Sequence, residues 1–392
     1  MLSKLDKWLD DNFQEIIKIR RWLHQHPEVG FNEHGTSQYC QDLMKKMGYE
    51  VTQNDAMKTG FYCDYGNSEG PTLIVRCDLD ALPIEEVNSC DYKSVNEGVS
   101  HACGHDSHMT NILGLASYMS DVKQEINGRV RFLFQPAEEL APGGAAVMIK
   151  AGALEGADHI IGGHILPSLS PHKIGIRHGA MAANVERLEI CLEGPGGHTS
   201  RPAKSVDLIR AQSNLVIALE EAMKHRLDQR EPVVIAFGKV EGGHTCNVLP
   251  SQINLSGTLR YLNSEIKNEL HGIIEDTVRS IELITNANIS WSIPHASPGL
   301  TNDDACTDLI IESANAVLGK ENVEIMENSS MGGEDFAYFL EVIPGAYFRI
   351  GCFDGKTRDI HTNDFNIDEN CIKTAIKVFS ETVTRYFMLH SK

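Results

Sequence analysis

The 392-residue sequence lacks an apolar run long enough to cross a membrane, and it contains no internal repeat or low-complexity tract. It is also poor in positive charge, because 35 lysines and arginines face 54 aspartates and glutamates, which gives a formal net charge of −19. Nucleic acids and anionic membranes bind positively charged surfaces, so this balance disfavours both as partners. The acidic surplus is compatible with a bound cation.

The ten cysteines are scattered and form no CxxC pair. Small secreted scaffolds, in contrast, are dense in cysteine. The opening segment, MLSKLDKWLDDNF, is amphipathic and acidic and has no apolar core like that of a signal peptide. We therefore expect a cytoplasmic protein whose thiols are reduced.

The first half of the chain alternates short apolar runs with helical patterns. An N-terminal amphipathic helix is expected to end near Pro27, since the residue before proline disfavours helical geometry. Strands that are apolar throughout and alternate with helices indicate a mostly parallel sheet covered by helices on both faces. The expected strands lie near 72–77, 130–135 and 159–163, and the expected helices near 36–47, 109–119 and 145–152.

The pattern changes near residue 184. VERLEICLEG alternates apolar and polar residues, which is typical of a half-exposed antiparallel strand, and we expect it at a sheet edge that another chain covers. This strand begins a strand–helix–strand–strand–helix–strand order, which predicts an α+β sandwich, and the polar segment 294–304 is expected to be a linker. We therefore predict a discontinuous α/β domain at 1–183 and 300–392, with a mostly parallel mixed sheet, and an inserted α+β domain at 184–299.

Four segments carry potential metal ligands just past predicted strands, at the edge where open α/β sheets bind ligands. Cys103 and His105 are two residues apart, which puts both on one side of an extended segment. Asp106 suits the N-cap of the following helix. A thiolate, imidazoles and carboxylates together suit zinc or a similar divalent ion. The segments are CDLDALP (77–83), HACGHDSH (101–108), QPAEE (135–139) and GGHILP (162–167).

Each of these signals is weak when it is taken alone. A single histidine after a strand is more often a hydrogen-bonded structural residue, and a buried cysteine is usually an inert apolar group. Paired glutamates such as Glu138 and Glu139 are most often solvated, but these two follow a strand that is expected to be buried, where unpaired charge is costly. Several such placements at strand ends together favour a metal site.

Nine motifs in order resemble those of the aminoacylase/carboxypeptidase family of di-metal amidohydrolases. The resemblance covers the chain from about residue 20 to residue 368. It is greatest to the branch of hippurate hydrolases, N-acyl-amino-acid amidohydrolases and indole-acetyl-amino-acid hydrolases, which implies cleavage of the amide between an acyl group (acetyl, benzoyl or aryl-acetyl) and an amino acid. N-acetyl-diaminopimelate deacetylase and metallo-carboxypeptidase are alternatives. The motifs are HPEVGF, DLDALP, HACGHD, FQPAEE, GGHILP, GGHTSRP, CNVLP, GGEDFAYF and IHTNDF.

The resemblance implies two divalent metal ions per subunit, with zinc favoured and manganese, cobalt or nickel as alternatives. Cys103 would bridge the two ions as a thiolate. Asp80 would orient a ligand through a hydrogen bond, although it could instead only cap a turn. Glu138 would be the general base that accepts a proton from water and then donates it to the leaving amine. The remaining implied ligands are His105, Glu139, His164 and His361.

The resemblance also assigns roles in the inserted domain. His198 would polarise the scissile carbonyl, with a surface-loop histidine as the alternative. Asn247 and Arg260 would hold the substrate carboxylate, and Gly333 would help to shape the acyl pocket, although the two acids after Gly333 could simply begin a helix. A homodimer or homotetramer through this domain is implied, with His198 reaching the metal site of the partner subunit.

Two functions of other kinds are disfavoured. A cysteine hydrolase would use Cys103 and His105, but residues at this spacing are poorly placed for a nucleophile–base hydrogen bond that a third group orients. A metal-binding protein without catalysis has no use for Glu138 beside a ligand set. Some positions depart from the branch, such as Thr362 and Asn363 where Ser-Pro is more frequent; these leave the expected ligands in place but weaken inference about the substrate pocket.

Overall fold

The computed structural model describes residues 2–67 and 69–390. The chain divides into two compact units. Unit 1 comprises Met1–Met181, Thr301–Asn328 and Asp335–Lys392, and unit 2 comprises Ala182–Leu300 and Ser329–Glu334. The short segment Ser329–Glu334 belongs to unit 2, whereas the sequence predicts it in the discontinuous domain.

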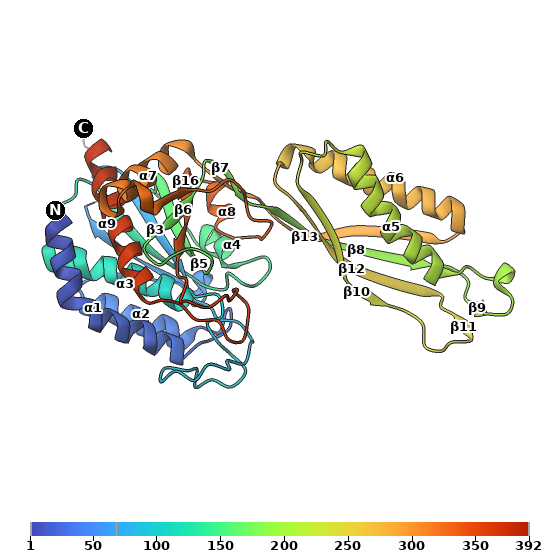
Figure 1. Ribbon diagram of the computed structural model, residues 1–392, viewed down its shortest axis with the longest axis horizontal. Helices are drawn as coiled ribbons and strands as arrows, with labels where there is room; N and C mark the ends of the chain where they lie inside the picture. Colours follow the sequence, from blue (N-terminus) through green and yellow to red (C-terminus); the bar gives the residue numbers. More distant parts are fainter. Residues whose placement is uncertain (1, 68, 391–392) are drawn as a thin grey trace. The chain divides into compact units, whose positions relative to one another are not determined.

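Unit 1 is built on an eight-stranded mixed sheet with the order β1-β2-β4-β3-β5-β16-β6-β15. Figure 1 shows four of its strands, β3, β5, β6 and β16, among the helices of the unit. The central strands β4, β3, β5 and β16 run parallel to their neighbours in this group, whereas β2 pairs antiparallel with β4 and β6 pairs antiparallel with β16. This arrangement confirms the predicted α/β fold. The strands are β1 Val51–Thr52, β2 Phe61–Gly66, β3 Thr72–Asp78, β4 Arg129–Gln135, β5 His159–Leu166, β6 Ile174–Ile176, β15 Val323–Ile325 and β16 Gly345–Gly351; β7 (Gly179–Ala182) and β14 (Leu300–Asn302) form a separate two-stranded sheet.

The helices of unit 1 bury the sheet. Every residue of β3 is buried, as the apolar run from Leu73 to Val75 predicts for a strand covered on both faces. α3 packs against α1 and α9, and the three share one apolar core with the sheet. No helix within the described residues is long and apolar enough to span a membrane. The helices are α1 Leu2–Gln25, α2 His34–Lys46, α3 His105–Val122, α4 Gly144–Lys150, α7 Asp304–Leu318, α8 Ala337–Leu340 and α9 Asn370–His390.

Unit 2 contains an antiparallel four-stranded sheet with the order β10-β12-β8-β13, together with two helices. Apolar residues from β8, such as Leu188 and Leu192, form a second core with residues of α5 and α6, such as Leu215 and Ile274. The predicted α+β order is therefore confirmed. The elements are β8 Asn184–Glu193, β9 Gly197–His198, α5 Leu208–Arg226, β10 Val233–Glu241, β11 Val248–Leu249, β12 Gln252–Tyr261, α6 Lys267–Thr285 and β13 Asn288–Ser297.

Two expectations for this region are wrong. β8 lies inside its sheet between β12 and β13, and the described edge strands are β10 and β13. The alternation in β8 reports one buried and one solvated face and carries no information about strand neighbours. The expected linker 294–304 begins inside β13, which continues to Ser297 after a register shift between Ser292 and His295. Pro294 lies at this shift, and an edge strand tolerates a proline there because proline has no N–H to donate to the ladder.

Candidate metal centre

The parallel strands of unit 1 bring the candidate ligands to one edge of the sheet. Asp80 follows β3, and Glu138 and Glu139 follow β4. His164 is expected just past a strand, but it lies within β5, because that strand continues to Leu166. His361 lies in the loop that follows β16.

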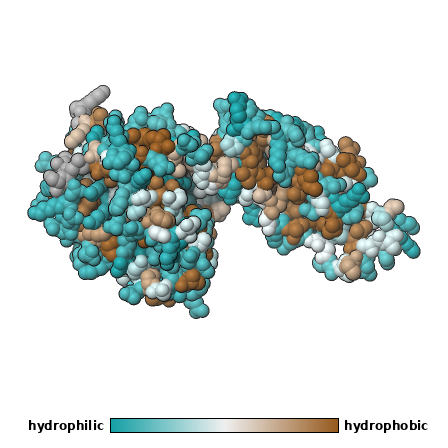
Figure 2. Space-filling model, viewed as in Figure 1, coloured by the Kyte–Doolittle hydropathy of each residue, from teal (hydrophilic) through white to brown (hydrophobic). Residues whose placement is uncertain are grey.

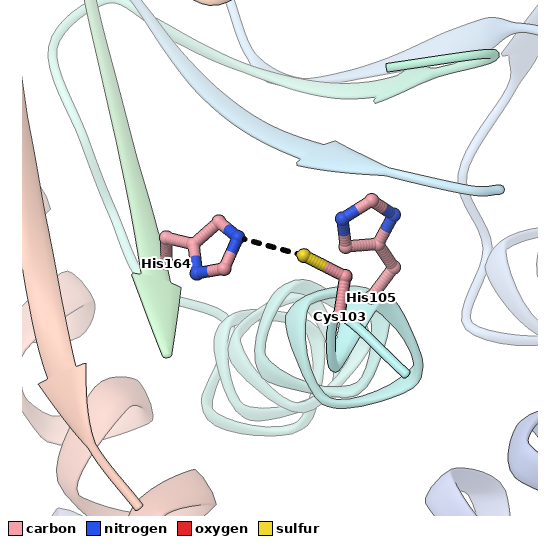
Figure 3. A group of neighbouring side chains, drawn as sticks. All are labelled: Cys103, His105 and His164. Carbon is pink, nitrogen blue, oxygen red and sulfur yellow. Dashed lines mark hydrogen bonds between the residues drawn. The ribbon is translucent and has the colours of Figure 1, made fainter. Parts of the chain in front are cut away.

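Cys103 belongs to two overlapping groups of candidate ligands. Its ligand atom lies within 4.8 Å of those of His105 and His164 in one group, and within 4.8 Å of those of Glu139 and His361 in the other. The Cys103 Sγ lies 3.2 Å from Nε2 of His164, and Figure 3 shows the sulfur between the two imidazole rings. The structure thus brings together all five residues that the resemblance implies as ligands, with the cysteine common to both groups.

Hydrogen bonds to the backbone fix the tautomers of the two buried histidines. The Nδ1 of His105 donates to the carbonyl oxygen of Asp80 at 2.8 Å, and the Nδ1 of His164 donates to the carbonyl oxygen of Ile165 at 2.7 Å. Nε2 of each ring is therefore the nitrogen that can ligate a metal when the ring is neutral. The Nε2 of His105 is buried and has no hydrogen-bond partner among the described residues, so this donor atom is available to a cation.

The turn between the cysteine and the first histidine depends on Gly104. Its φ of +80° lies in the left-handed region, and a Cβ there would lie 2.7 Å from Cγ1 of Ile165. Glycine at the N-cap therefore allows the tight turn between Cys103 and His105, the first residue of the helix.

The sequence predicts Asp106 as the N-cap of α3, but this prediction is wrong, because Gly104 occupies that position. Asp106 lies in the first turn and is fully buried. Its Oδ2 lies 2.9 Å from Nε of Arg20 and 2.8 Å from Nδ1 of His24. The position one residue after a candidate ligand thus anchors α3 to α1.

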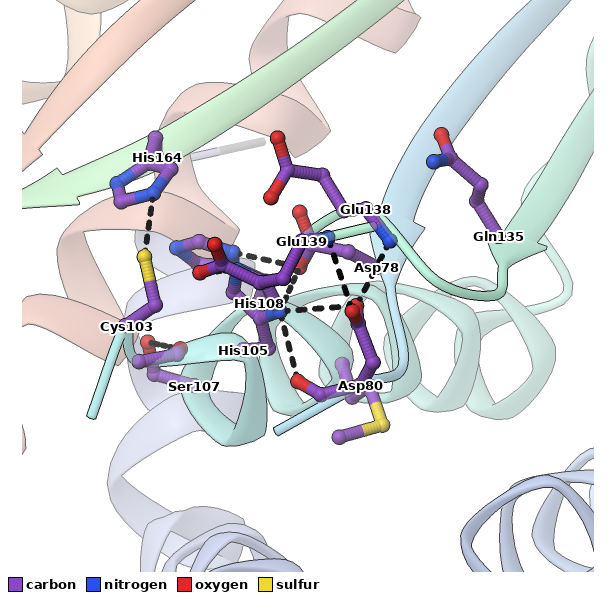
Figure 4. A network of polar contacts seen from close by, with 12 residues as sticks. Asp78, Asp80, Cys103, His105, Ser107, His108, Gln135, Glu138, Glu139 and His164 are labelled. Atoms are coloured by element: carbon purple, nitrogen blue, oxygen red, sulfur yellow. Dashed lines mark hydrogen bonds and ion pairs between the residues drawn. The ribbon is translucent and has the colours of Figure 1, made fainter. Parts of the chain in front are cut away.

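The loop after β4 is held by the Asp80 carboxylate. Its Oδ1 accepts the N–H of Glu138 and its Oδ2 accepts the N–H of Glu139, both at 3.0 Å (Figure 4). Asp80 Oδ1 also lies 3.3 Å from Nδ1 of His105. One buried carboxylate thus contacts both the loop with the two glutamates and the first histidine of the cluster.

His361 is the most exposed of the candidate ligands, with 47% of its side chain accessible. Its N–H donates to the carbonyl oxygen of Ala102 at 2.8 Å, which ties the C-terminal loop to the segment that carries Cys103. Its Nε2 lies 3.0 Å from Oε1 of Glu139, and this hydrogen bond raises the pKa of His361.

Burial sets the ionisation of the two central groups. It raises the pKa of the Cys103 thiol well above its usual range and lowers the pKa of His164 well below its usual range. The imidazole is therefore neutral and ready to ligate. A thiolate at Cys103 requires a compensating positive charge, which a bound divalent cation supplies.

The four other candidate residues belong to unit 2, and their roles stay predictions. His198 lies on β9, where its Nδ1 accepts the N–H of Ser200 at 3.1 Å, so that Nε2 is the donor of the neutral ring. The carbonyl oxygen of Asn247 accepts the N–H of Thr199 at 3.2 Å. The two others are Arg260, whose Nη1 donates to the carbonyl oxygen of Met331 at 2.8 Å, and Gly333.

A buried polar network beside the cluster was missed at the level of the sequence. Asp78 lies 2.8 Å from Nδ1 of His108 and 2.7 Å from Nη1 of Arg76. Arg76 also donates to Asp335 at 3.0 Å, and the amide of Gln135 donates to the same carboxylate at 2.7 Å. A signal was present, because Arg76 and Asp78 are charged residues in an otherwise apolar strand and must be paired when buried. Asp335 therefore anchors this network. From the sequence, its loop is expected to shape the acyl pocket, and this contact is not predicted.

Comparisons with known proteins agree with this geometry. Residues 74–385 match the model of peptidase family M20/M25/M40. The chain is 36% identical over 390 residues to N-acetyl-L-cysteine deacetylase of Bacillus subtilis, covering 98% of this chain and 89% of the relative, and 34% identical over 382 residues to N-acetyldiaminopimelate deacetylase of the same organism, covering 96% and 99%. The crystal structure of the Bacillus subtilis YXEP protein, described as a dinuclear metal binding peptidase from the M20 family, superposes with a TM-score of 0.83 at 30% identity and covers 96% of this chain and 98% of that one.

Proposed function

The chain belongs to peptidase family M20/M25/M40, and from this premise we propose that it is a dinuclear metal-dependent amidohydrolase that cleaves N-acyl amino acids into a carboxylic acid and a free amino acid. One observation carries the proposal: two groups of candidate ligands share the Cys103 sulfur, with the Glu138 carboxylate beside them. The names of the two deacetylase relatives support an N-acetyl amino acid as the substrate class.

The donor set fits two divalent cations. It offers one thiolate, three imidazoles and one carboxylate, which suits zinc first and manganese, cobalt or nickel as alternatives. Nε2 of His105 supports the fit, because a buried polar atom without a hydrogen-bond partner is costly unless something binds it. Two cations held there would activate an attacking water and polarise the scissile carbonyl.

The two adjacent glutamates are proposed to have different roles. Glu139 contacts His361, and both belong to the group that contains Cys103, so Glu139 is the ligand. Glu138 lies next to it in the chain, in a group with His105 and Glu139. We assign Glu138 as the general base, which takes a proton from water and passes it to the leaving amine.

Substrate recognition is proposed for unit 2. Nε2–H of His198 would donate to the carbonyl oxygen on which negative charge develops. Arg260 would bind the substrate carboxylate with the guanidinium nitrogens that do not contact Met331, and Asn247 would add an amide hydrogen bond. Gly333 would leave room for the acyl group.

We also propose that unit 2 mediates a homodimer or homotetramer. Large apolar side chains are exposed on its two helices, and apolar residues are visible on the surface of this unit (Figure 2). The edge strand β10 pairs only with β12 among the described residues and exposes Val234 and Val240. The exposed apolar residues on the helices are Ile209 and Ile217 of α5 and Leu283 and Ile284 of α6.

A cytoplasmic location is proposed as well, and it is consistent with ten cysteines that are all free of disulfides.

A substrate panel tests the function. The protein is stripped with a chelator, reloaded with zinc, manganese, cobalt or nickel, and assayed with N-acetyl-cysteine, N-acetyl-diaminopimelate, N-benzoyl and indole-acetyl amino acids, and dipeptides. We expect metal-dependent release of the free amino acid from at least one N-acyl substrate, and none from the Glu138→Gln variant. Release from dipeptides alone would establish the carboxypeptidase alternative, and a metal-loaded protein that cleaves nothing would establish a non-catalytic metal protein.

A further inference from the structure

Glu33 is a buried carboxylate that contacts the loop of the two glutamates, although it lies 104 positions before Ala137 in the sequence. Its side chain is fully buried, and its Oε1 accepts the N–H of Ala137 at 2.8 Å. We propose that Glu33 is a positioning residue, which holds the loop 136–139 in the conformation that directs Glu138 and Glu139 at the metal cluster. The inference rests on the proposed function and adds a residue to its machinery.

The loop needs such support because Ala137 has a φ of +47°. A residue with a side chain rarely adopts this left-handed geometry, and it persists only where the surroundings hold it. Both sides of Ala137 are held: Glu33 accepts its N–H, and its carbonyl oxygen accepts the N–H of Gly144 at 2.9 Å. A turn of this kind immediately before the two glutamates sets the direction in which they leave the backbone.

Glu33 completes a row of carboxylate contacts along the loop. Asp80 accepts the N–H groups of Glu138 and Glu139, and Glu33 accepts the N–H just before them, so three consecutive N–H groups are held by two carboxylates. The segment that carries Glu33 is itself tied to the segment of Asp80. The N–H of Ala81 donates to the carbonyl oxygen of Glu28 at 2.8 Å.

Helix capping does not explain the position of the Glu33 side chain. Glu33 occupies the N-cap of α2 but makes no side-chain capping hydrogen bond. The Glu28 carboxylate accepts the N–H groups of Gly35 and Thr36 at 3.1 and 2.7 Å instead. The Glu33 carboxylate is oriented by Thr59, whose hydroxyl donates to its Oε2 at 2.6 Å. Its buried oxygens therefore contact the loop 136–139 and Thr59 rather than the helix.

Three variants test the proposal. Glu33→Ala removes the acceptor for the Ala137 N–H, whereas Glu33→Gln keeps an acceptor oxygen. Glu28→Ala is the control, because it removes a carboxylate from the same segment between α1 and α2 that does not contact the loop 136–139. We expect Glu33→Ala to lower kcat by about 10- to 100-fold with little change in KM, and to weaken metal binding, measured by titrating the stripped protein with cobalt, by about 10-fold or more. Glu33→Gln should stay within about threefold of the wild type in both, and Glu28→Ala should lower only the melting temperature. If Glu33→Ala does not fold, Thr59→Val replaces it, with the same changes in smaller size.

The readouts separate the two proposals. If Glu33→Ala lowers the melting temperature while kcat and cobalt affinity match those of Glu28→Ala, the residue is merely structural and the inference is overturned. Equal losses in Glu33→Gln and Glu33→Ala also overturn it, because a retained acceptor would then be worth nothing. If the wild type hydrolyses no N-acyl amino acid but Glu33→Ala still weakens cobalt binding and Glu33→Gln restores it, the proposed function fails and the positioning role stands.

Discussion

The Cys103 Sγ lies 3.2 Å from Nε2 of His164, although the two residues are 61 positions apart in the sequence. Bond lengths of about 2.3 Å to sulfur and about 2.0 Å to nitrogen separate two ligands of one tetrahedral zinc by about 3.5 Å. The observed distance is close to this separation, so a small outward movement of one side chain suffices to admit a cation. The segment before α3 and the end of β5 are therefore already arranged to bind a common cation.

Removing the shared sulfur should abolish metal binding at one or both positions. We expect Cys103→Ala to retain far less metal than the wild type after dialysis, because Cys103 is the one candidate ligand that these two groups share. Metal content is measured by elemental analysis. Cys40→Ala is the matched control, since Cys40 is a buried core cysteine whose Sγ lies 3.8 Å from Sδ of Met109. Equal metal content in the two variants would remove Cys103 from the site.

Measurements of kcat and metal content should distinguish the roles of the two adjacent glutamates. Glu138→Gln keeps the size of the side chain but removes the proton acceptor, and general-base catalysis contributes about 10²- to 10⁴-fold. We expect this variant to lose kcat by that factor while its metal content stays near that of the wild type. Glu139→Gln should lose metal, because it alters a ligand that contacts His361. The opposite result would mean that the roles of the two carboxylates are reversed.

Much of the fold could be predicted from local sequence patterns. The apolar runs at 72–77 and 130–135 correspond to β3 and β4, and the helix expected near 109–119 lies within α3. Period and burial determine these elements, and both are visible in a single sequence. The neighbours of a strand are not visible in this way. β8 was therefore wrongly expected at an edge, since its alternation is the same for any strand with one covered face.

The candidate ligands were found through motifs, whereas the contacts that support them were not. Asp78, Arg76 and Glu33 each form a hydrogen bond to a residue far away in the sequence. Such pairings depend on how the elements pack, and a buried charge in a strand indicates only that some partner exists. Asp106 shows the same limit, because its helical position suited a cap, while its partners are Arg20 and His24 of α1.

The buried ion pair between Arg76 and Asp335 should contribute strongly to the free energy of unfolding. Asp335→Ala leaves Arg76 with Asp78 but removes an acceptor from Gln135 as well, and breaking a buried pair costs about 3–5 kcal/mol. We expect a loss of this order in the free energy of unfolding, measured with urea. Asp308→Ala is the control, because Asp308 pairs with His178 on the surface, where an ion pair contributes about 0–1 kcal/mol. Similar losses in both variants would show that the network is not a major source of stability.

His198 provides the sharpest test of quaternary structure. If a dimer brings it to the partner's metal site, His198→Ala should lose about 10²- to 10³-fold in kcat with its metals retained, because a donor to the developing oxyanion is lost. Mixing His198→Ala with Glu138→Gln under subunit exchange should then restore activity, since one of the two sites in each heterodimer combines an intact base with an intact histidine. The control mixture is Glu138→Gln with Glu139→Gln. Both of its changes lie in unit 1, so no site becomes intact and no activity should return. If the first mixture exchanges subunits and yet stays as inactive as its parents, His198 acts within its own chain or has no catalytic role.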